Sequence, residues 1–164
     1  MIELRDVVVA YESRVILDSI NLTIDDGETL VILGGSGSGK STLLRLLIGL
    51  QRPTSGQIIV DGTDITTLSE DEFNTVRRKM GMVFQYSALF DSMSVGENVA
   101  FGLRQHTDLG DDEIRRIVAE RLDWVGLKGY ESYMPNELSG GMKKRVSLAR
   151  AIALDPSLIL YDEP

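Results

Sequence analysis

Apolar and polar residues alternate at two different periods along the first half of the chain. Runs rich in valine and isoleucine at Ile2 to Tyr11 and Val15 to Ile24 predict two strands, and Asp25-Asp26-Gly27 predicts a turn after the second. A third apolar run, Glu28 to Leu33, ends in glycines, and leucines at helical spacing between Ser41 and Leu50 follow it. This stretch therefore predicts a strand, a glycine-rich loop and a helix, in that order.

A second mixed stretch follows this helix. Gln57 to Val60 predicts a strand, and Ser69 with Glu72 three residues later is the pattern of a helix N-terminal capping box. The helix that they open is expected to end near Arg78. The apolar run Met80 to Phe84 then predicts one more strand.

From Gln85 onward the periodicity is helical until the last apolar run. Helices are predicted at Val95 to Arg104, Asp111 to Val125 and Ser139 to Leu154, the last of them stopped by a following proline. Leu158 to Tyr161 then predicts a short strand buried on both faces of a parallel sheet.

Length and composition fit one folded domain, because 164 residues with 43% hydrophobic content can bury a core. Strand-rich sequence on both sides of a helical block indicates an α/β core, residues 1–85 and 155–164, that carries a helical subdomain, residues 86–154. The apolar runs are far shorter than the about 20 residues that cross a bilayer. No secretory signal pattern opens the chain, so a cytosolic location is expected.

Charge and cysteine content exclude some classes of partner and of structural site. A net charge of -8 without a basic stripe argues against nucleic acid as the main partner. The absence of cysteine removes disulfides and thiolate zinc sites.

The run Gly34-Gly35-Ser36-Gly37-Ser38-Gly39-Lys40-Ser41 matches the phosphate-loop pattern between a strand and a helix. Its glycines let backbone amides turn toward phosphates, and the helix dipole adds partial positive charge. Lys40 is expected to reach the β and γ phosphates of a nucleotide, and the Ser41 hydroxyl to bind Mg²⁺. Distant acidic residues are screened beyond about 8 Å, so the net charge is no obstacle. A purely structural glycine-rich loop is the alternative.

Two carboxylates follow the last apolar run. Asp162 and Glu163 come at the C-terminal end of the predicted strand Leu158 to Tyr161, which is where ligands bind in open α/β sheets. Asp162 is suited to the Mg²⁺ shell and Glu163 to polarising the attacking water. The alternative is an Asp-Glu pair in a surface turn, which the presence of the phosphate loop disfavours.

A second helix also begins with glycines. Ser139-Gly140-Gly141 opens it, and each glycine in a first turn costs about 1 kcal/mol in helix propensity, which is unusual unless a ligand must approach closely. An ordinary capped helix is the alternative. Two anion-binding helix starts with one catalytic carboxylate indicate that the second serves a nucleotide bound to another copy.

Tyr11 stands at the end of the first predicted strand, ahead of the phosphate loop. Its ring could stack on adenine, or pack on its neighbours as strand-end aromatic residues do, and the residues alone favour neither.

These motifs, with Gln85 between the first two, closely resemble the nucleotide-binding domain of the ATP-binding cassette (ABC) family over essentially the whole chain. The resemblance implies a P-loop α/β core with an antiparallel β-subdomain and a helical subdomain, and a head-to-tail homodimer that sandwiches two ATP molecules. It assigns the metal- and water-sensing glutamine to Gln85, the metal-shell carboxylate to Asp162, the base to Glu163 and adenine stacking to Tyr11. The phosphate loop extends to Thr42, and the signature that contacts ATP across the dimer is Ser139, Gly140, Gly141 and Met142.

Two details are similar to the Mla/Ttg2-type ATPases. They are the run Phe84-Gln85-Tyr86-Ser87-Ala88-Leu89-Phe90-Asp91, and Met142 in place of the usual glutamine, followed by Lys143-Lys144-Arg145. This resemblance implies a lipid-trafficking transporter with a separate membrane permease and an MCE-domain partner. The chain would then lie on the cytoplasmic face of the inner membrane, with its helical subdomain near Gln85 to Leu103 docked on the permease.

The family's aspartate loop, switch histidine and last core strands do not follow Glu163, since the chain stops at Pro164. The sequence is therefore expected to be truncated, with ATP binding retained and turnover in question. The leading hypothesis is the ATP-hydrolysing subunit of a transporter. The alternatives are the ABC ATPase of an importer for a different substrate, a non-transport ABC ATPase, a P-loop kinase of small molecules and a nucleotide-binding module without catalysis.

Overall fold

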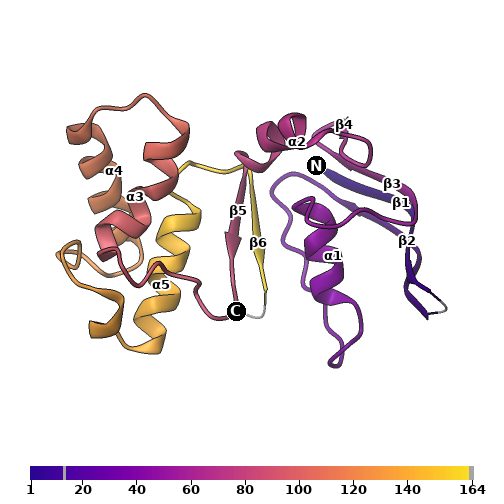
Figure 1. The fold of residues 1–164 in the computed structure, drawn as a ribbon, viewed down its shortest axis with the longest axis horizontal. Helices are drawn as coiled ribbons and strands as arrows, with labels where there is room; N and C mark the ends of the chain where they lie inside the picture. Colours follow the sequence, from indigo (N-terminus) through magenta and orange to yellow (C-terminus); the bar gives the residue numbers. More distant parts are fainter. Residues whose placement is uncertain (13, 163–164) are drawn as a thin grey trace. The chain divides into compact units, whose positions relative to one another are not determined.

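The computed structural model describes residues 1–12 and 14–162, and the chain divides into two compact units, Met1–Thr75 and Val76–Pro164 (Figure 1). Glu163, a predicted site residue, lies outside the described residues. Each unit is built around elements of its own, so the two are described in turn.

The first unit contains a four-stranded antiparallel sheet in the order β2-β1-β3-β4. Its strands are β1 (Ile2–Tyr11), β2 (Arg14–Ile24), β3 (Ser55–Val60) and β4 (Thr63–Asp64). Alternate residues of β1 are buried, as its valine and isoleucine pattern predicts. The three longer predicted strands of this region are therefore confirmed, and they form the antiparallel sheet that the resemblance implied.

The pairing of β1 with β2 is irregular. The register shifts between Leu4 and Val7 and again on either side of Val9. Asp6 and Ser19 both adopt a left-handed backbone conformation, with φ of 49° and 47°. The Asn21 side chain bridges the irregularity, because its Oδ1 accepts from the Asp6 amide at 3.0 Å and its Nδ2 donates to the Asp6 carboxylate at 2.9 Å. These bulges are thus held by specific hydrogen bonds.

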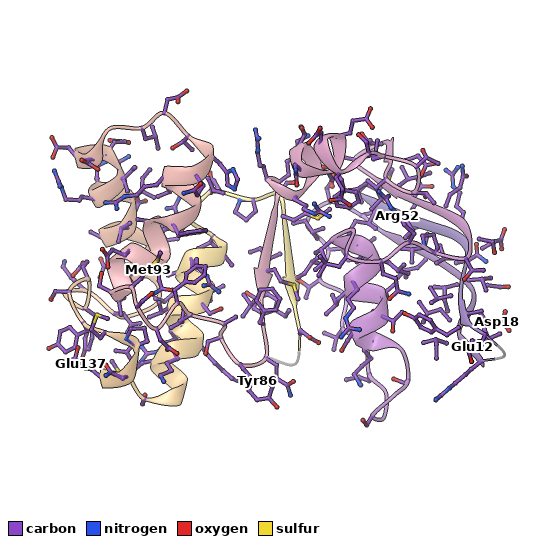
Figure 2. All side chains as sticks on the ribbon, viewed as in Figure 1. Glu12, Asp18, Arg52, Tyr86, Met93 and Glu137 are labelled. Carbon is purple, nitrogen blue, oxygen red and sulfur yellow. The ribbon has the colours of Figure 1, made fainter. Side chains whose placement is uncertain are left out.

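Two helices accompany this sheet, α1 (Lys40–Leu47) and α2 (Glu70–Arg77). The predicted capping box of α2 is confirmed, since the Ser69 amide donates to the Glu72 carboxylate at 2.9 Å. This hydrogen bond lowers the pKa of Glu72. Phe73 of α2 is fully buried, and the Arg52 guanidinium, labelled in Figure 2, lies 5.5 Å from the centre of its ring.

A close approach between the backbones of β1 and β3 requires glycine at position 56 of β3. Its φ is +90°, and a Cβ at this position would overlap the carbonyl oxygen of Asp6. We expect Gly56→Ala in the full-length protein to lower the free energy of unfolding by about 2–4 kcal/mol, because a left-handed alanine adds to a clash with backbone. Gly62→Ala is the matched control, since Gly62 is also left-handed but has open space around it, and should cost only about 1 kcal/mol. Urea unfolding compares the two, and equal losses would contradict the role of the close approach.

The second unit joins a helical bundle to a short parallel sheet. The helices are α3 (Val95–His106), α4 (Asp111–Trp124) and α5 (Gly140–Ala151), with a 3₁₀ turn η1 (Pro135–Glu137) before α5. The strands β5 (Met80–Val83) and β6 (Leu158–Tyr161) pair in parallel, Met80 beside Leu158 and Val83 beside Tyr161. All three predicted helices are confirmed, although the last ends three residues before Leu154.

The three helices enclose their own apolar core (Figure 1). Apolar residues at helical spacing on each helix meet there, as amphipathic periodicity predicts. Its buried members include Val95, Val99, Leu103, Ile114, Val118, Leu122, Val146 and Ala149. Among the described residues, no helix is long and apolar enough to cross a membrane.

Two predictions about strands are wrong in this structure. Residues 28–33 form no strand, and Val31 and Leu33 are 71% and 89% exposed. A strand needs a neighbour for its N–H and C=O groups, and neither described sheet pairs with this segment. Likewise β6 is not buried on both faces, since Ile159 and Tyr161 are exposed while Leu160 is buried.

Candidate functional site

The glycine-rich segment leads directly into α1. Gly39 is the N-cap residue of that helix and has φ +95°, a left-handed conformation that favours glycine. A Cβ on Gly39 would lie 2.8 Å from the Leu17 side chain and 3.3 Å from the Ile16 carbonyl oxygen. Glycine at this position therefore allows the loop to lie against β2 where α1 begins.

Lys40 folds back across this loop. Its Nζ donates to the carbonyl oxygens of Gly34, at 2.8 Å, and Gly35, at 3.1 Å. The ammonium group thus lies beside the glycine-rich loop. A phosphate chain bound by the loop amides would therefore also lie near this positive charge. Ser41 and Thr42 follow in the first turn of α1.

The first turns of the helices differ in charge. α2 begins with Glu70, Asp71 and Glu72, α3 with Glu97 in its first turn, and α4 with Asp111, Asp112 and Glu113. Acidic residues there are favourable because they neutralise the positive end of the helix dipole. Of the α-helices that the described residues form, only α1 and α5 have no acidic residue in the first turn. The positive ends of these two helix dipoles are therefore not neutralised by acidic side chains of their own first turns.

At the start of α5, Ser139 is the N-cap, and its Oγ accepts a hydrogen bond from the Met142 amide at 3.3 Å. A Cβ added to Gly140 or Gly141 would meet no atom within 4 Å, so neither glycine is required by packing inside this chain. Their absence of side chains instead leaves the helix start accessible. This supports the interpretation of residues 139–142 as a second anion-binding element, and it weakens the alternative of an ordinary capped helix.

Gln85 and Asp162 lie at one edge of the β5–β6 sheet. Because β5 and β6 are parallel, their C-terminal ends coincide, and the Asp162 amide donates to the Val83 carbonyl at 3.0 Å. Gln85 comes two residues after Val83 and is exposed, while Asp162 is half-buried. The structure therefore brings these two predicted metal-site residues to the same sheet edge, as the sequence order predicts.

Oxygen donors suit magnesium. Gln85, Asp162 and Ser41 would supply an amide oxygen, a carboxylate and a hydroxyl, all hard ligands that Mg²⁺ accepts in small number while it keeps several waters. Within residues 1–12 and 14–162, no group of three or more His, Asp or Glu side chains forms a metal cluster. By their chemistry, the amide, carboxylate and hydroxyl oxygens of these side chains each fit Mg²⁺ as a ligand.

Tyr11 ends β1 and belongs to the same unit as the phosphate loop. Its side chain is 51% exposed, so a ring face is accessible to a planar base. The exposure agrees with the expectation of adenine stacking.

Two anchoring residues were missed by the sequence interpretation, Asn98 and Arg150. Asn98 is fully buried in α3 and holds the segment before that helix. Its Oδ1 accepts from the Phe90 amide at 2.8 Å, and its Nδ2 donates to the carbonyls of Phe90, Met93 and Ser94 at 3.0–3.1 Å. An asparagine on the apolar face between Val95 and Leu103 is the signal that could have revealed it.

Comparison with known proteins gives a consistent result. The model of the family described as "ABC transporter" matches residues 17–164. The chain is 49% identical over 164 residues to the intermembrane phospholipid transport system ATP-binding protein MlaF of Haemophilus influenzae, which covers all of this chain and 62% of that protein. It is 50% identical over 163 residues to the probable ribonucleotide transport ATP-binding protein mkl of Mycobacterium tuberculosis, covering 99% of this chain and 45% of the relative. The chain thus spans about three fifths or less of these relatives' length.

Solved structures agree on the fold. The ATP-binding cassette MJ0796, in a dimeric post-hydrolysis state bound to ADP and Pi, superposes with a TM-score of 0.90 at 36% identity, covering 99% of this chain and 73% of that one. The protein cbiO1 of Clostridium perfringens, part of the transporter complex cbiONQ, gives a TM-score of 0.90 at 34% identity, covering 99% and 65%.

Proposed function

We propose, from the premise that this chain belongs to the ABC transporter family, that it binds ATP with Mg²⁺ and hydrolyses it to power a transporter. The observation that carries this proposal is that three features occur together at the start of α1. They are a glycine-rich loop, the Lys40 ammonium group hydrogen-bonded to that loop, and a first helical turn without acidic residues. Together they make a site for a polyanion in a protein whose net charge is -8.

The residues divide the chemistry among them. Lys40 and the amides of the phosphate loop hold the β and γ phosphates. Ser41, Gln85 and Asp162 would hold Mg²⁺, which would supply positive charge to neutralise the phosphate oxygens. Water attacks the γ phosphorus, the bond to the β–γ bridging oxygen breaks, and the water proton passes to the Glu163 carboxylate. The products are ADP and phosphate, and Glu163 must release its proton before the next turnover.

We propose further that the protein acts as a head-to-tail homodimer. The helix start at Ser139 lacks an acidic residue and has open glycines, so it can face a nucleotide held by the phosphate loop of a second copy. The dimeric state of the MJ0796 cassette bound to ADP and Pi supports this arrangement. The division into an α/β core, residues 1–85 and 155–164, and a helical subdomain, residues 86–154, belongs to the same proposal.

The cargo we propose is phospholipid or another lipid, moved by a separate membrane permease. The likeness to MlaF, named for phospholipid transport, supports it, and an MCE-domain protein is then the expected substrate-binding partner. The segment after β5 offers exposed aromatic side chains for docking on the permease, with Tyr86 86% and Phe90 40% exposed. The protein would sit at the cytoplasmic face of the inner membrane. The similar identity to mkl favours ribonucleotide transport as the second candidate.

Phosphate release by the full-length protein with MgATP tests the proposal. We expect turnover, transfer of no phosphate to an added small-molecule acceptor, and copurification with a membrane subunit. Absence of hydrolysis in the complex with that subunit would contradict the proposed ATPase. Phosphorylation of an acceptor would favour a kinase instead.

The adenine contact gives a separate prediction. Tyr11→Ala is expected to raise the dissociation constant for ATP about tenfold, since stacking on an aromatic ring contributes about 1–3 kcal/mol per base. Tyr11→Phe keeps the ring and should bind like the wild type. Fluorescence titration with a labelled ATP measures both. If Tyr11→Ala also binds like the wild type, Tyr11 packs on its neighbours rather than on the nucleotide.

A further inference from the structure

The segment between β5 and α3 carries Gln85 and is anchored from two sides. Figure 2 labels Tyr86 and Met93, which lie near its two ends. Asn98 holds the second half of the segment through the hydrogen bonds described above. The first half has a different anchor, the Arg150 side chain, which reaches it from the last turn of α5.

Arg150 binds two consecutive carbonyl groups. Its Nη1 donates to the Ala88 oxygen at 2.7 Å and its Nη2 to the Ser87 oxygen at 3.0 Å, while its guanidinium carbon lies 5.7 Å from the centre of the Phe90 ring. A planar fork with two parallel donors suits this arrangement, and a lysine could not reproduce it. Burial of the guanidinium lowers the pKa of Arg150.

The backbone that Arg150 binds is strained. Ser87 and Ala88 are both left-handed, with φ of 59° and 46°, and each non-glycine residue in that conformation costs on the order of 1 kcal/mol. Two such residues in succession persist only where the surroundings hold them. Ser87 is itself buried, at 6% exposure. Two backbone hydrogen bonds also act here, from the Ser87 amide to the Phe84 carbonyl and from the Ala88 amide to the Tyr86 carbonyl. Together with them, the Arg150 hydrogen bonds therefore hold the path of the chain directly after Gln85.

The two ends of α5 thus have different tasks. Ser139, at its start, belongs to the proposed second nucleotide contact, and Arg150 lies about 16 Å further along the helix, at 1.5 Å per residue. A helix of this length moves as a rigid element. The carbonyls of Ser87 and Ala88 are thus bound to the same helix that begins after Ser139.

We propose that Arg150 is a positioning residue that sets the conformation of the Gln85 segment. The inference rests on the proposed ATPase function and adds a residue to it. Arg150 acts through the carbonyl groups of Ser87 and Ala88.

The test compares Arg150→Met, which keeps the apolar stem and removes both hydrogen bonds, with Arg150→Lys in the full-length protein. Arg145→Met is the matched control, because Arg145 lies on the same helix and also donates to two loop carbonyls, Val125 at 3.0 Å and Gly126 at 3.3 Å. Two quantities are measured: hydrogen exchange of residues 84–93 without nucleotide, and phosphate release as a function of Mg²⁺ concentration.

We expect Arg150→Met to speed exchange in residues 84–93 at least about tenfold while exchange in α3 and α4 stays as in the wild type. Turnover should fall about tenfold or more, with a higher Mg²⁺ concentration needed for half-maximal rate, since misplacing a reacting group by about 1 Å can cost a hundredfold. Arg150→Lys should lie between Arg150→Met and the wild type. Arg145→Met should leave exchange in residues 84–93 and the Mg²⁺ dependence unchanged.

Three outcomes would overturn the proposal: wild-type exchange and Mg²⁺ dependence in Arg150→Met, faster exchange spread equally over α3 and α4, or the same Mg²⁺ shift in Arg145→Met. If Arg150→Met does not fold, Arg150→Lys decides by the same two measurements. A wild-type protein without turnover would contradict the proposed function alone, because exchange is measured without nucleotide and still reports whether Arg150 holds the segment.

Discussion

Lys40→Ala in the full-length protein is expected to weaken ATP binding by about ten- to a hundredfold and to abolish detectable turnover. A charge-assisted hydrogen bond to phosphate contributes about 1.5–3 kcal/mol, and Lys40 is the one side chain of the loop that brings a full positive charge. The substitution also removes the two hydrogen bonds by which Lys40 fastens Gly34 and Gly35, so the loop itself becomes less ordered. Calorimetric titration with MgATP gives the affinity, and phosphate release gives the rate.

Lys128→Ala is the control for the loss of one positive charge. Lys128 is exposed and lies in the loop after α4, in the unit that does not contain the phosphate loop. The Lys128→Ala variant should bind and hydrolyse ATP like the wild type. Equal ATP affinity in the Lys40→Ala variant and the wild type would remove the phosphate-loop interpretation and the proposed function with it.

Glu163→Gln is expected to lower turnover by about 10³-fold while ATP affinity is retained. The amide keeps the size and hydrogen-bonding capacity of the carboxylate but cannot take a proton from water, and a general base contributes on the order of 10²–10⁴-fold. ATP then stays bound unhydrolysed, so the dimer should become the predominant species. Single-turnover phosphate release measures the first effect and size-exclusion chromatography with ATP the second.

Glu113→Gln provides the matched acid-to-amide change at a distance from the site. Glu113 is in the first turn of α4 and pairs with Arg116 at 2.6 Å, which lowers the pKa of the Glu113 carboxyl. Loss of this exposed pair should leave turnover unchanged. Full turnover in Glu163→Gln would assign the base to another residue.

Much of this fold could be predicted because local pattern determined it. The alternation in residues 2–24, the capping box at Ser69 and the helical periods after Val95 each depend on neighbours close in sequence, and all three are confirmed. The strand prediction for residues 28–33 failed because strand formation depends on partners that are distant in sequence. An apolar run indicates that a segment prefers burial. A strand also requires a hydrogen-bonding neighbour, and periodicity does not reveal whether one is present.

The same distinction separates the parts of the site. The glycine loop with Lys40 and the Ser139 helix start are contiguous motifs, so the sequence could identify them. Asn98 and Arg150 act on a loop through contacts that only the fold creates; the carbonyls of Ser87 and Ala88 are 63 and 62 positions away from Arg150. The roles of Asn98 and Arg150 depend on the burial of their side chains, and neither composition nor spacing reveals that burial.

The irregular pairing of β1 with β2 has a consequence for the behaviour of the protein at high concentration. β2 is an outer strand of its sheet, and an outer strand with a regular row of unpaired N–H and C=O groups is a template on which another polypeptide can add a strand. The left-handed backbone at Ser19 and the register shifts beside it interrupt that row. Aggregation by strand addition is thereby disfavoured along β2.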